Sequence, residues 1–513
     1  MRGILVSSAL AACAALTLPF LATPSGATAP DTTPRPAPSA ARPAVPGSTH
    51  SLPLVPSRHR AVRGGGAERV LPPQDVPPFS MVGIVWDDAT AELRGTAQVR
   101  TRPVGAKQWS GWQDVETHDD DRPDLDSPET RGGSLRGSTA PLWVGACDAV
   151  QVRVRQDPAA GRTPDARPLP SGLRVELVDP GKDPRTPRTG RRAAPGSSER
   201  AAPAPSEEET AASAANVPLA PLGATEIPAM GKPESAKDVA ATHVDLASAS
   251  TAAAGKRTDP DGHGEGDPEG DTPDAPPAPP APPLPPVPPV PPAPTADPSD
   301  PPEEESDELA GYYVGPRPRI VTRAGWGADE SIRERGFPYT KTVRAAFVHH
   351  TASGNGYSCS QSASVIRGIY RYHVVSSGWR DLGYNFLVDK CGTVYEGRAG
   401  GVAKPVRGAH TLGFNTNSMG IAVLGSFGRT NPSEAAVDAV ATLTAWKLGL
   451  YDVNPAGRTT LVSGGGNLFK KGTSVKLKVI SGHRDGYATE CPGDRLYNRL
   501  GAARAEAARL QGR

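Results

Sequence analysis

The chain has 513 residues, and its 56 glycines and 58 prolines make up about a fifth of them, well above the usage of ordinary globular domains. Its 56 Lys and Arg residues nearly cancel its 55 Asp and Glu residues. The resulting net charge of +1 gives no reason to expect nucleic acid or an anionic membrane surface as a partner. The sequence has neither a heptad repeat nor a Gly-X-Y period, which excludes a coiled coil and collagen.

The aromatic residues divide the chain into regions that can fold and regions that cannot. Of 26 Phe, Trp and Tyr residues, five lie in 79–180, 20 lie in 309–513 and none lies in 181–308. A segment that lacks aromatics and is rich in Pro, Ala, Ser and Glu cannot bury enough apolar surface to offset its chain entropy. We therefore expect a small folded region at 78–180 and a larger one at 316–511.

Residues 1–29 have the pattern of a secretory signal peptide. Met1 and Arg2 give a positive start, residues 4–22 are apolar and uncharged, and a cleavage site of small residues follows. A membrane anchor is the alternative, but the apolar run contains Pro19 and is near the minimum length for spanning. We therefore expect a secreted protein without a stable membrane anchor.

The segment after the signal peptide changes character near residue 78. Residues 30–77 are rich in Pro, Ala and Arg and are predicted to be a disordered lead-in. In 78–180, short segments rich in β-branched residues are separated by turn residues, which predicts a small all-β domain of the sandwich type. These segments are residues 81–86, 97–102, 149–154 and 173–178.

Three tryptophans of the β domain, Trp109, Trp112 and Trp143, allow two interpretations. They could pack in the core or form a surface on which a sugar stacks. The core is favoured because tryptophan is mostly buried in small domains.

Residues 181–315 are predicted to be a disordered linker that is Pro-rich at 273–302. Within it, 14 of the 22 residues in 273–294 are proline, arranged as PPxPP repeats. A stretch of this kind forms a stiff polyproline II spacer.

Residues 316–511 mix the hydrophobic periods of strands and helices. Buried strands are predicted at 345–349 and 420–424, and a helix over 362–375. The alternation of strands and helices predicts an α/β domain with a mixed β-sheet flanked by helices. The other predicted elements are a hairpin of 384–388 and 393–396, a helix over 433–448 with Ser433 as N-cap, a strand over 476–480 and a helix over 496–510.

Three groups of polar residues lie at or just behind predicted strands. His349 and His350 end one strand, His483 follows another, and Cys491 lies eight residues after His483. Neighbouring side chains of a strand point to opposite faces, so one histidine of the first pair faces a cleft while the other faces away. Two imidazoles and one thiolate, with a fourth position open to water, are typical of a catalytic zinc site.

The cysteines leave two interpretations open. Without the signal peptide the chain has four of them, Cys147, Cys359, Cys391 and Cys491, and two disulfides are the simplest expectation for an exported protein. The zinc interpretation requires one metal thiolate, one disulfide and one remaining thiol. Spacing alone explains the histidines equally well as hydrogen-bonded structural residues, with Cys491 in a disulfide.

From about Pro318 to Leu500 the sequence resembles the peptidoglycan recognition protein and type 2 amidase family, the N-acetylmuramoyl-L-alanine amidases. The β-rich region before it also resembles an uncharacterised region that precedes such amidases in some exported bacterial proteins. The matching stretches occur in the family's order and spacing. They are Arg323-Ala-Gly-Trp-Gly327, Phe347-Val-His-His-Thr-Ala352, Tyr372-His373, Gly378-Trp-Arg-Asp-Leu-Gly-Tyr-Asn-Phe-Leu-Val388, Val394-Tyr-Glu-Gly-Arg398, Gly408-Ala-His410, Ser418-Met-Gly-Ile421, Gly482-His-Arg-Asp485 and Cys491-Pro-Gly-Asp494.

The resemblance implies a zinc site with two catalytic residues beside it. It implies His349, His483 and Cys491 as the ligands of Zn²⁺. Tyr384 is implied as the catalytic partner near the attacking water and the substrate carbonyl. Thr489 is implied as a hydrogen-bond donor to the carbonyl oxygen.

The resemblance also implies substrate contacts for His373, His410, Trp379 and Thr351. On the sequence alone, His373 and His410 are equally well explained as buried, hydrogen-bonded imidazoles. Gly378 and Trp379 match the pair that accompanies a preference for diaminopimelate over lysine in the stem peptide.

Two cysteines, Cys359 and Cys391, are expected to form a disulfide, because each lies beside the expected cleft and a bridge would pin the helix between them. This leaves Cys147 without an assigned partner.

The implied function is zinc-dependent hydrolysis of the amide bond between N-acetylmuramic acid and the first L-Ala of peptidoglycan. We expect a secreted, cell-wall-associated monomer with peptidoglycan as its partner. The alternative is a non-catalytic peptidoglycan-binding protein, but the three ligands and Tyr384 are all present, which favours the enzyme. In a third interpretation the amidase domain tethers the β domain to the wall, and only the linker supports it.

Overall fold

The computed structural model describes residues 47–57, 67–117, 121–124, 127–130, 135–157, 168–183, 205–238 and 313–513. The predicted signal peptide and the Pro-rich stretch at 273–302 lie outside these residues. Within the described ranges, no helix combines the length and the apolar character needed to cross a membrane.

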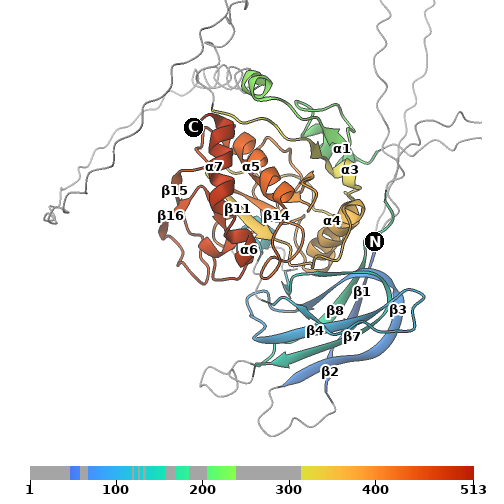
Figure 1. The fold of residues 1–513 in the computed structure, drawn as a ribbon. Coiled ribbons are helices and arrows are strands. Elements are labelled where there is room, and N and C mark those ends of the chain that lie inside the picture. Colours follow the sequence, from blue (N-terminus) through green and yellow to red (C-terminus); the bar gives the residue numbers. More distant parts are fainter. Residues whose placement is uncertain are drawn as a thin grey trace, which may run out of the picture. The chain divides into compact units, whose positions relative to one another are not determined.

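The first folded region is an all-β domain, as predicted (Figure 1). Its strands form one sheet in the order β1-β8-β3-β7-β4-β5, and β2 and β6 also pair with β3. The apolar residues of the predicted strand segments form the core of the domain, with Val82, Val152 and Val175 fully buried. The elements are β1 (Ser48–Pro53), β2 (Val55–Pro56), β3 (Glu68–Trp86), β4 (Gly95–Pro103), β5 (Gln113–Val115), η1 (Pro128–Thr130), β6 (Gly137–Ser138), β7 (Leu142–Gln156) and β8 (Arg174–Asp179).

The β domain begins earlier than predicted, so the expectation of a disordered lead-in over 30–77 is wrong for its described part. Strand β1 pairs with β8 along its whole length, and the first part of β3 pairs with β7. Leu54 and Leu71 are buried in the core. A few leucines among prolines therefore suffice to anchor this part of the chain in the core, although the composition of the segment hides them.

The three tryptophans of the β domain divide between core and surface. Trp143 is buried, as predicted. Trp109 and Trp112 are only half-buried, and guanidinium groups cover their rings. Arg100 lies 5.3 and 5.2 Å from the centroids of Trp109 and Trp112, and Arg153 lies 4.0 Å from that of Trp112. The core expectation is therefore wrong for these two, whose faces are occupied by cation–π contacts.

The second folded region is built on a mixed sheet in the order β17-β11-β14-β12-β13-β10-β9, and β15 and β16 form a separate hairpin. Strands β17, β11, β14 and β12 run parallel to their neighbours, and β12 is antiparallel to β13. The α/β prediction is confirmed. The strands are β9 (Glu226–Ile227), β10 (Ile320–Val321), β11 (Ala345–His350), β12 (Phe386–Val388), β13 (Val394–Glu396), β14 (Ser418–Val423), β15 (Arg458–Val462), β16 (Ser474–Lys478) and β17 (Ile480–Gly482).

Helices cover both faces of this sheet (Figure 1). Helices α5 and α7 share a core with Ile421 and Val423 of β14, whereas α4 packs with Ala422 on the opposite face. Ser433 is the N-cap of α5, as predicted, and its hydroxyl accepts a hydrogen bond from the Ala436 N–H. The helical elements are α1 (Glu207–Ala214), α3 (Arg323–Trp326), η2 (Cys359–Gln361), α4 (Ser362–Arg371), η3 (Tyr372–Ser376), α5 (Glu434–Gly449), η4 (His483–Asp485), α6 (Asp494–Tyr497) and α7 (Leu500–Gln511).

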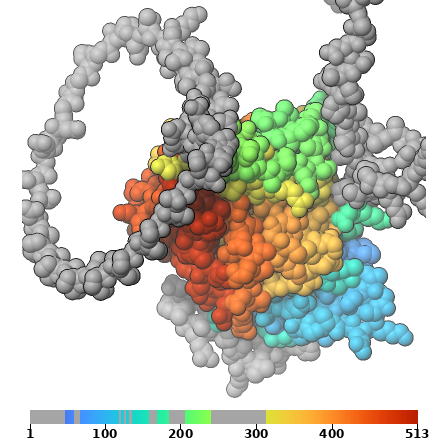
Figure 2. Space-filling view, turned by 45° about the horizontal axis from the view of Figure 1, so that its top comes forward, coloured from blue at the N-terminus to red at the C-terminus, as the bar shows by residue number. Residues whose placement is uncertain are grey.

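The predicted linker contains a folded segment, residues 205–238, which is a second correction. Its β9 pairs antiparallel with β10 and places the fully buried Ile227 opposite Ile320. Figure 2 shows this segment in green against the start of the α/β domain in yellow. A two-residue strand has no visible period, so the sequence pattern could not indicate it.

The β domain and the α/β domain share a hydrophobic core. Met81, Val85 and Val178 of the β domain belong to the same buried cluster as Ile369 of α4. The Tyr372 hydroxyl donates to backbone carbonyls of the β domain at distances of 3.2 and 3.1 Å. The two domains are therefore packed together as one continuous interior.

Candidate metal centre

The pairing of β11 with β17 brings the two predicted histidine ligands together. Val348 of β11 lies opposite Gly482 of β17, so the next residues in register are His349 and His483. The strands are parallel, and the carboxyl ends of parallel strands meet at the same edge of a sheet. The centroids of the two imidazole rings are 4.6 Å apart.

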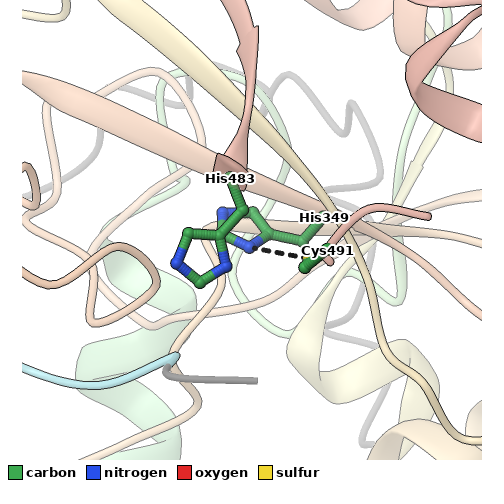
Figure 3. A group of neighbouring side chains, drawn as sticks. All are labelled: His349, His483 and Cys491. Atoms are coloured by element: carbon green, nitrogen blue, oxygen red, sulfur yellow. Dashed lines mark hydrogen bonds between the residues drawn. The ribbon is translucent and has the colours of Figure 1, made fainter. Parts of the chain in front are cut away.

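The three predicted metal ligands converge on one point (Figure 3). A nitrogen of His349, a nitrogen of His483 and the sulfur of Cys491 all lie within 4.8 Å of one another. The Cys491 sulfur is 3.7 Å from Nδ1 of His349, and all three side chains are fully buried. Burial also lowers the pKa of His483 well below its usual value, so its imidazole is neutral and its nitrogen lone pair is available to a metal.

The loop after η4 holds Cys491 in place. The Thr489 hydroxyl accepts a hydrogen bond from the Cys491 N–H at 3.2 Å, and the Arg484 N–H donates to the Cys491 carbonyl at 3.1 Å. Thr489 is half-buried. The structure thus gives Thr489 a positioning contact to a ligand residue, while its predicted catalytic role stays a prediction.

His350 points to the opposite face of β11. Its Nδ1 accepts a hydrogen bond from the Phe427 N–H at 3.4 Å, and its Nε2 lies 3.8 Å from the Glu116 carboxylate. Burial lowers the pKa of His350 to about 3. The alternation expected for the His349–His350 pair is present.

Tyr384, the predicted catalytic residue, lies beside the three ligands. Its ring centroid is 5.5 Å from that of His349, and its hydroxyl donates a 2.5 Å hydrogen bond to Oδ2 of Asp121. Tyr384 precedes β12 and is buried. The phenol is thus close enough to act on a group bound at the ligand cluster.

Asp121 was not identified from the sequence. It comes from the β domain, and its Oδ1 lies 2.9 Å from Nδ1 of His349 and 3.2 Å from Nδ1 of His483. In the sequence it ends the acidic run His118-Asp-Asp-Asp121, a pattern typical of a solvated loop. Only the fold reveals that this carboxylate reaches the histidines of another domain.

Two of the predicted substrate contacts stack on each other. The rings of His373 and Trp379 are 4.2 Å apart, and both side chains are buried. The Gly383 N–H donates to Nδ1 of His373 at 3.2 Å, and burial lowers the pKa of His373 to about 3. His373 is therefore a neutral imidazole with a structural hydrogen bond, and its predicted contact with substrate stays a prediction.

The other two predicted substrate contacts, His410 and Thr351, are buried within the domain. His410 has its ring 5.3 Å from that of His349 and contacts Thr411 through Nδ1. The Thr351 hydroxyl accepts a hydrogen bond from the Gly425 N–H and contacts Ser353. Thr351 thus links its loop to that of Gly425, and the predicted contacts of both residues with substrate stay predictions.

Two of the four cysteines lie at disulfide distance. The sulfurs of Cys359 and Cys391 are 2.07 Å apart. Cys147 is buried in β7, and burial raises the pKa of its thiol. Cys491 lies with the histidines, so the alternative with Cys491 in a disulfide does not match its position.

The donor set fits a zinc ion. Two imidazole nitrogens and one thiolate sulfur are the ligand types that zinc prefers, and three protein ligands are the number found in its catalytic sites. The nearby carboxylate of Asp121 adds an oxygen donor, and its Oδ1 makes no hydrogen bond among the described residues although it is buried between two imidazoles.

Two protein families match parts of the chain. Residues 31–173 match the family described as Rv3811 N-terminal galactose-binding domain-like. Residues 339–494 match the family described as N-acetylmuramoyl-L-alanine amidase, and this region contains the three converging ligands.

Individual relatives match about a third of the chain. Peptidoglycan-recognition protein SC2 of Drosophila simulans is 32% identical over 184 residues, which cover 35% of this chain and 84% of that protein. An N-acetylmuramoyl-L-alanine amidase of Homo sapiens is 33% identical over 187 residues, which cover 36% of this chain and 28% of that protein. A solved structure of peptidoglycan recognition protein-LE in complex with tracheal cytotoxin, a monomeric diaminopimelic acid-type peptidoglycan, is 29% identical, with a TM-score of 0.27 and coverage of 36% of this chain and 92% of that one.

Proposed function

The chain belongs to the peptidoglycan recognition protein and type 2 amidase family, and from this premise we propose that it is a zinc-dependent N-acetylmuramoyl-L-alanine amidase. The proposal is carried by the convergence of His349, His483 and Cys491 within 4.8 Å, with the Tyr384 ring beside them. In the reaction, water adds across the amide bond between N-acetylmuramic acid and L-Ala. The C–N bond breaks, the lactyl group leaves as a carboxylate, and the stem peptide leaves with a free amino terminus.

The three converging residues would hold the zinc ion. When bound, the ion would polarise the substrate carbonyl and lower the pKa of a water molecule, so that hydroxide is available near neutral pH. The hydrogen bonds of the Cys491 N–H to Thr489 and of the Arg484 N–H to the Cys491 carbonyl hold the backbone of this ligand in place. This preorganisation removes the cost of assembling the site for each substrate.

Tyr384 would act directly on the reacting group. Its hydroxyl already donates to an anionic oxygen beside the ligand cluster, which shows the direction in which the phenol points. In the amidase reaction the same O–H would donate to the oxygen on which negative charge develops. A donor of this kind contributes a few kcal/mol, roughly 100-fold in rate or more.

The other parts of the proposal concern secretion of the protein, its disulfide and its substrate. The N-terminal signal-peptide pattern supports secretion, and a Cys359–Cys391 disulfide would suit an oxidising compartment. Peptidoglycan as the substrate follows from the names of the relatives.

The direct test is hydrolysis of a muropeptide that carries N-acetylmuramic acid. We expect the purified chain to release stem peptide with a free L-Ala amino group, detected by mass spectrometry, and we expect a zinc chelator to stop the release. Tyr384→Phe should lower the rate about 100-fold. Tyr339→Phe is the matched control, because Tyr339 is exposed and its hydroxyl donates to the Gly400 carbonyl. Release that persists in the chelator would contradict a zinc mechanism.

A second candidate is a recognition protein that binds peptidoglycan without cleaving it. The name of the Drosophila relative favours it, and the Asp121 carboxylate already lies at the ligand cluster. Binding of the same muropeptide without any release of stem peptide, with or without Asp121, would support this candidate.

A further inference from the structure

A segment of the β domain enters the site of the α/β domain. We call residues 121–124 and 127–130 together the docking segment. It carries three buried carboxylates, Asp121, Asp124 and Glu129, whose exposed fractions are 7, 7 and 8%. A buried carboxylate is costly unless it is paired, so the partners of these three show what holds the segment in place.

The first carboxylate lies at the ligand cluster. Oδ1 of Asp121 is 2.9 Å from His349 Nδ1 and 3.2 Å from His483 Nδ1, while Oδ2 accepts the hydrogen bond of Tyr384. We propose that Asp121 is a fourth protein ligand of the metal site and that the docking segment keeps the proposed amidase closed. This inference rests on the proposed function, since it assigns a ligand to the same metal.

The second carboxylate anchors the segment beside the cluster. Oδ1 of Asp124 accepts hydrogen bonds from the Gly413 N–H at 2.7 Å and from the Asn415 amide at 2.9 Å. Its Oδ2 forms an ion pair with Arg407 at 2.8 Å. The Asn415 amide also donates to the Arg122 carbonyl at 3.0 Å. The α/β domain therefore binds both carboxylate oxygens of Asp124 and the backbone carbonyl of Arg122.

The third carboxylate forms a buried ion pair. The two oxygens of Glu129 accept hydrogen bonds from the Arg398 guanidinium at 2.8 and 3.0 Å, and the Arg380 N–H donates to the same carboxylate at 3.2 Å. Arg398 is almost fully buried. Two-point contacts of this kind fix geometry as well as charge, so the segment is held in one position.

The consequence concerns access to the metal. Catalytic zinc sites keep a position open for water or substrate, whereas sites with four protein ligands are closed. With Asp121 in the fourth position and bonded to Tyr384, both the ligand cluster and the proposed catalytic hydroxyl are engaged by the protein itself. A peptidoglycan substrate must therefore compete with the docking segment for the fourth metal position. In this way the β domain controls when the amidase can act.

The test uses the full chain loaded with Co²⁺, whose visible absorption reports ligands added from solution. Azide is the probe, because it binds a metal only where a coordination position is available. We expect the wild-type spectrum to change little on addition of azide. Asp121→Ala should show a saturable spectral change, with an apparent affinity for azide at least 10-fold higher than in the wild type.

Two further variants make the result decisive. Asp121→Asn keeps the size of the side chain and serves as the test variant if Asp121→Ala does not fold. It should also raise the apparent affinity for azide above that of the wild type. Asp114→Asn is the matched control, because this exposed residue of β5 contacts Gln98 instead of the α/β domain. Wild-type protein that takes up azide as readily as the Asp121 variants would overturn the closed site while leaving the proposed function intact. Failure of every form to bind Co²⁺ would overturn the metal site itself, and with it both proposals.

Discussion

At the scale of single residues, neighbouring positions of one strand have different roles, one in the ligand cluster and one in the packing of the domain. His349 faces the ligand cluster, and His350, the next residue on the same strand, is held neutral on the other face by burial. The alternation of a strand was enough to predict this division. The sequence pattern could not show that Thr351 supports a loop, because Gly425, whose N–H donates to its hydroxyl, is distant in the chain.

A pH dependence of stability follows from His373. Its folded pKa of about 3 lies below the ordinary value of 6.5, so its contribution to stability is complete above pH 6.5 and is lost as the pH falls toward 3. In that pH range, protonation of His373 in the unfolded state lowers the free energy of unfolding by about 1.4 kcal/mol per pH unit. Between pH 7.5 and 5.0, the free energy of unfolding in urea should therefore fall by about 2 kcal/mol less in His373→Gln than in the wild type.

The control for this prediction is His50→Gln in β1, whose side chain is half-buried. The free energy of unfolding of this variant should fall with decreasing pH by as much as that of the wild type. An acid sensitivity that is the same in His373→Gln and the wild type would show that His373 is not held neutral by the fold.

At the scale of elements, the long and strongly periodic segments were predictable and the short edge elements were not. Strands β11 and β14 and helices α4 and α5 follow their hydrophobic periods, because each buries one face or both. Strands β1 and β9 do not, since proline or short length removes the period.

The segment 205–238 should contribute to the stability of the α/β domain. The Asn216 amide donates to Glu396 of β13 at 2.9 Å, and its oxygen accepts the Val402 N–H at 2.9 Å, all in a buried setting. Asn216→Ala leaves both groups without these partners and should lower the free energy of unfolding by about 1–3 kcal/mol.

The matched control for Asn216 is Val217→Ala, because Val217 is the next residue and is exposed. This change should alter the free energy of unfolding by less than about 0.5 kcal/mol in denaturant titrations. Equal effects of the two changes would mean that the segment is not part of the folded domain.

At the scale of the whole molecule, the β domain and the α/β domain should unfold together. Their shared core and the Tyr372 hydrogen bonds cross the boundary, so loss of one domain exposes apolar surface of the other. We expect one calorimetric transition for the full chain. Two well-separated transitions would contradict the shared core.

The same scale explains why the site was only partly predictable. The motifs around His349, His483 and Cys491 lie within one domain and could be combined from the sequence. The Asp121 contact joins two domains, and a single acidic run carries no information about the surface against which it packs. Family resemblance covers the first kind of contact but does not extend to the second.

The most direct test of the account is the zinc content of the purified chain, measured by mass spectrometry of the bound metal. The account predicts one zinc ion per wild-type chain, and loss of the ion in His349→Ala, His483→Ala and Cys491→Ser. His350→Gln, the neighbour that faces away, should retain it. A wild-type chain without zinc, or zinc retained in all three ligand variants, would contradict the account.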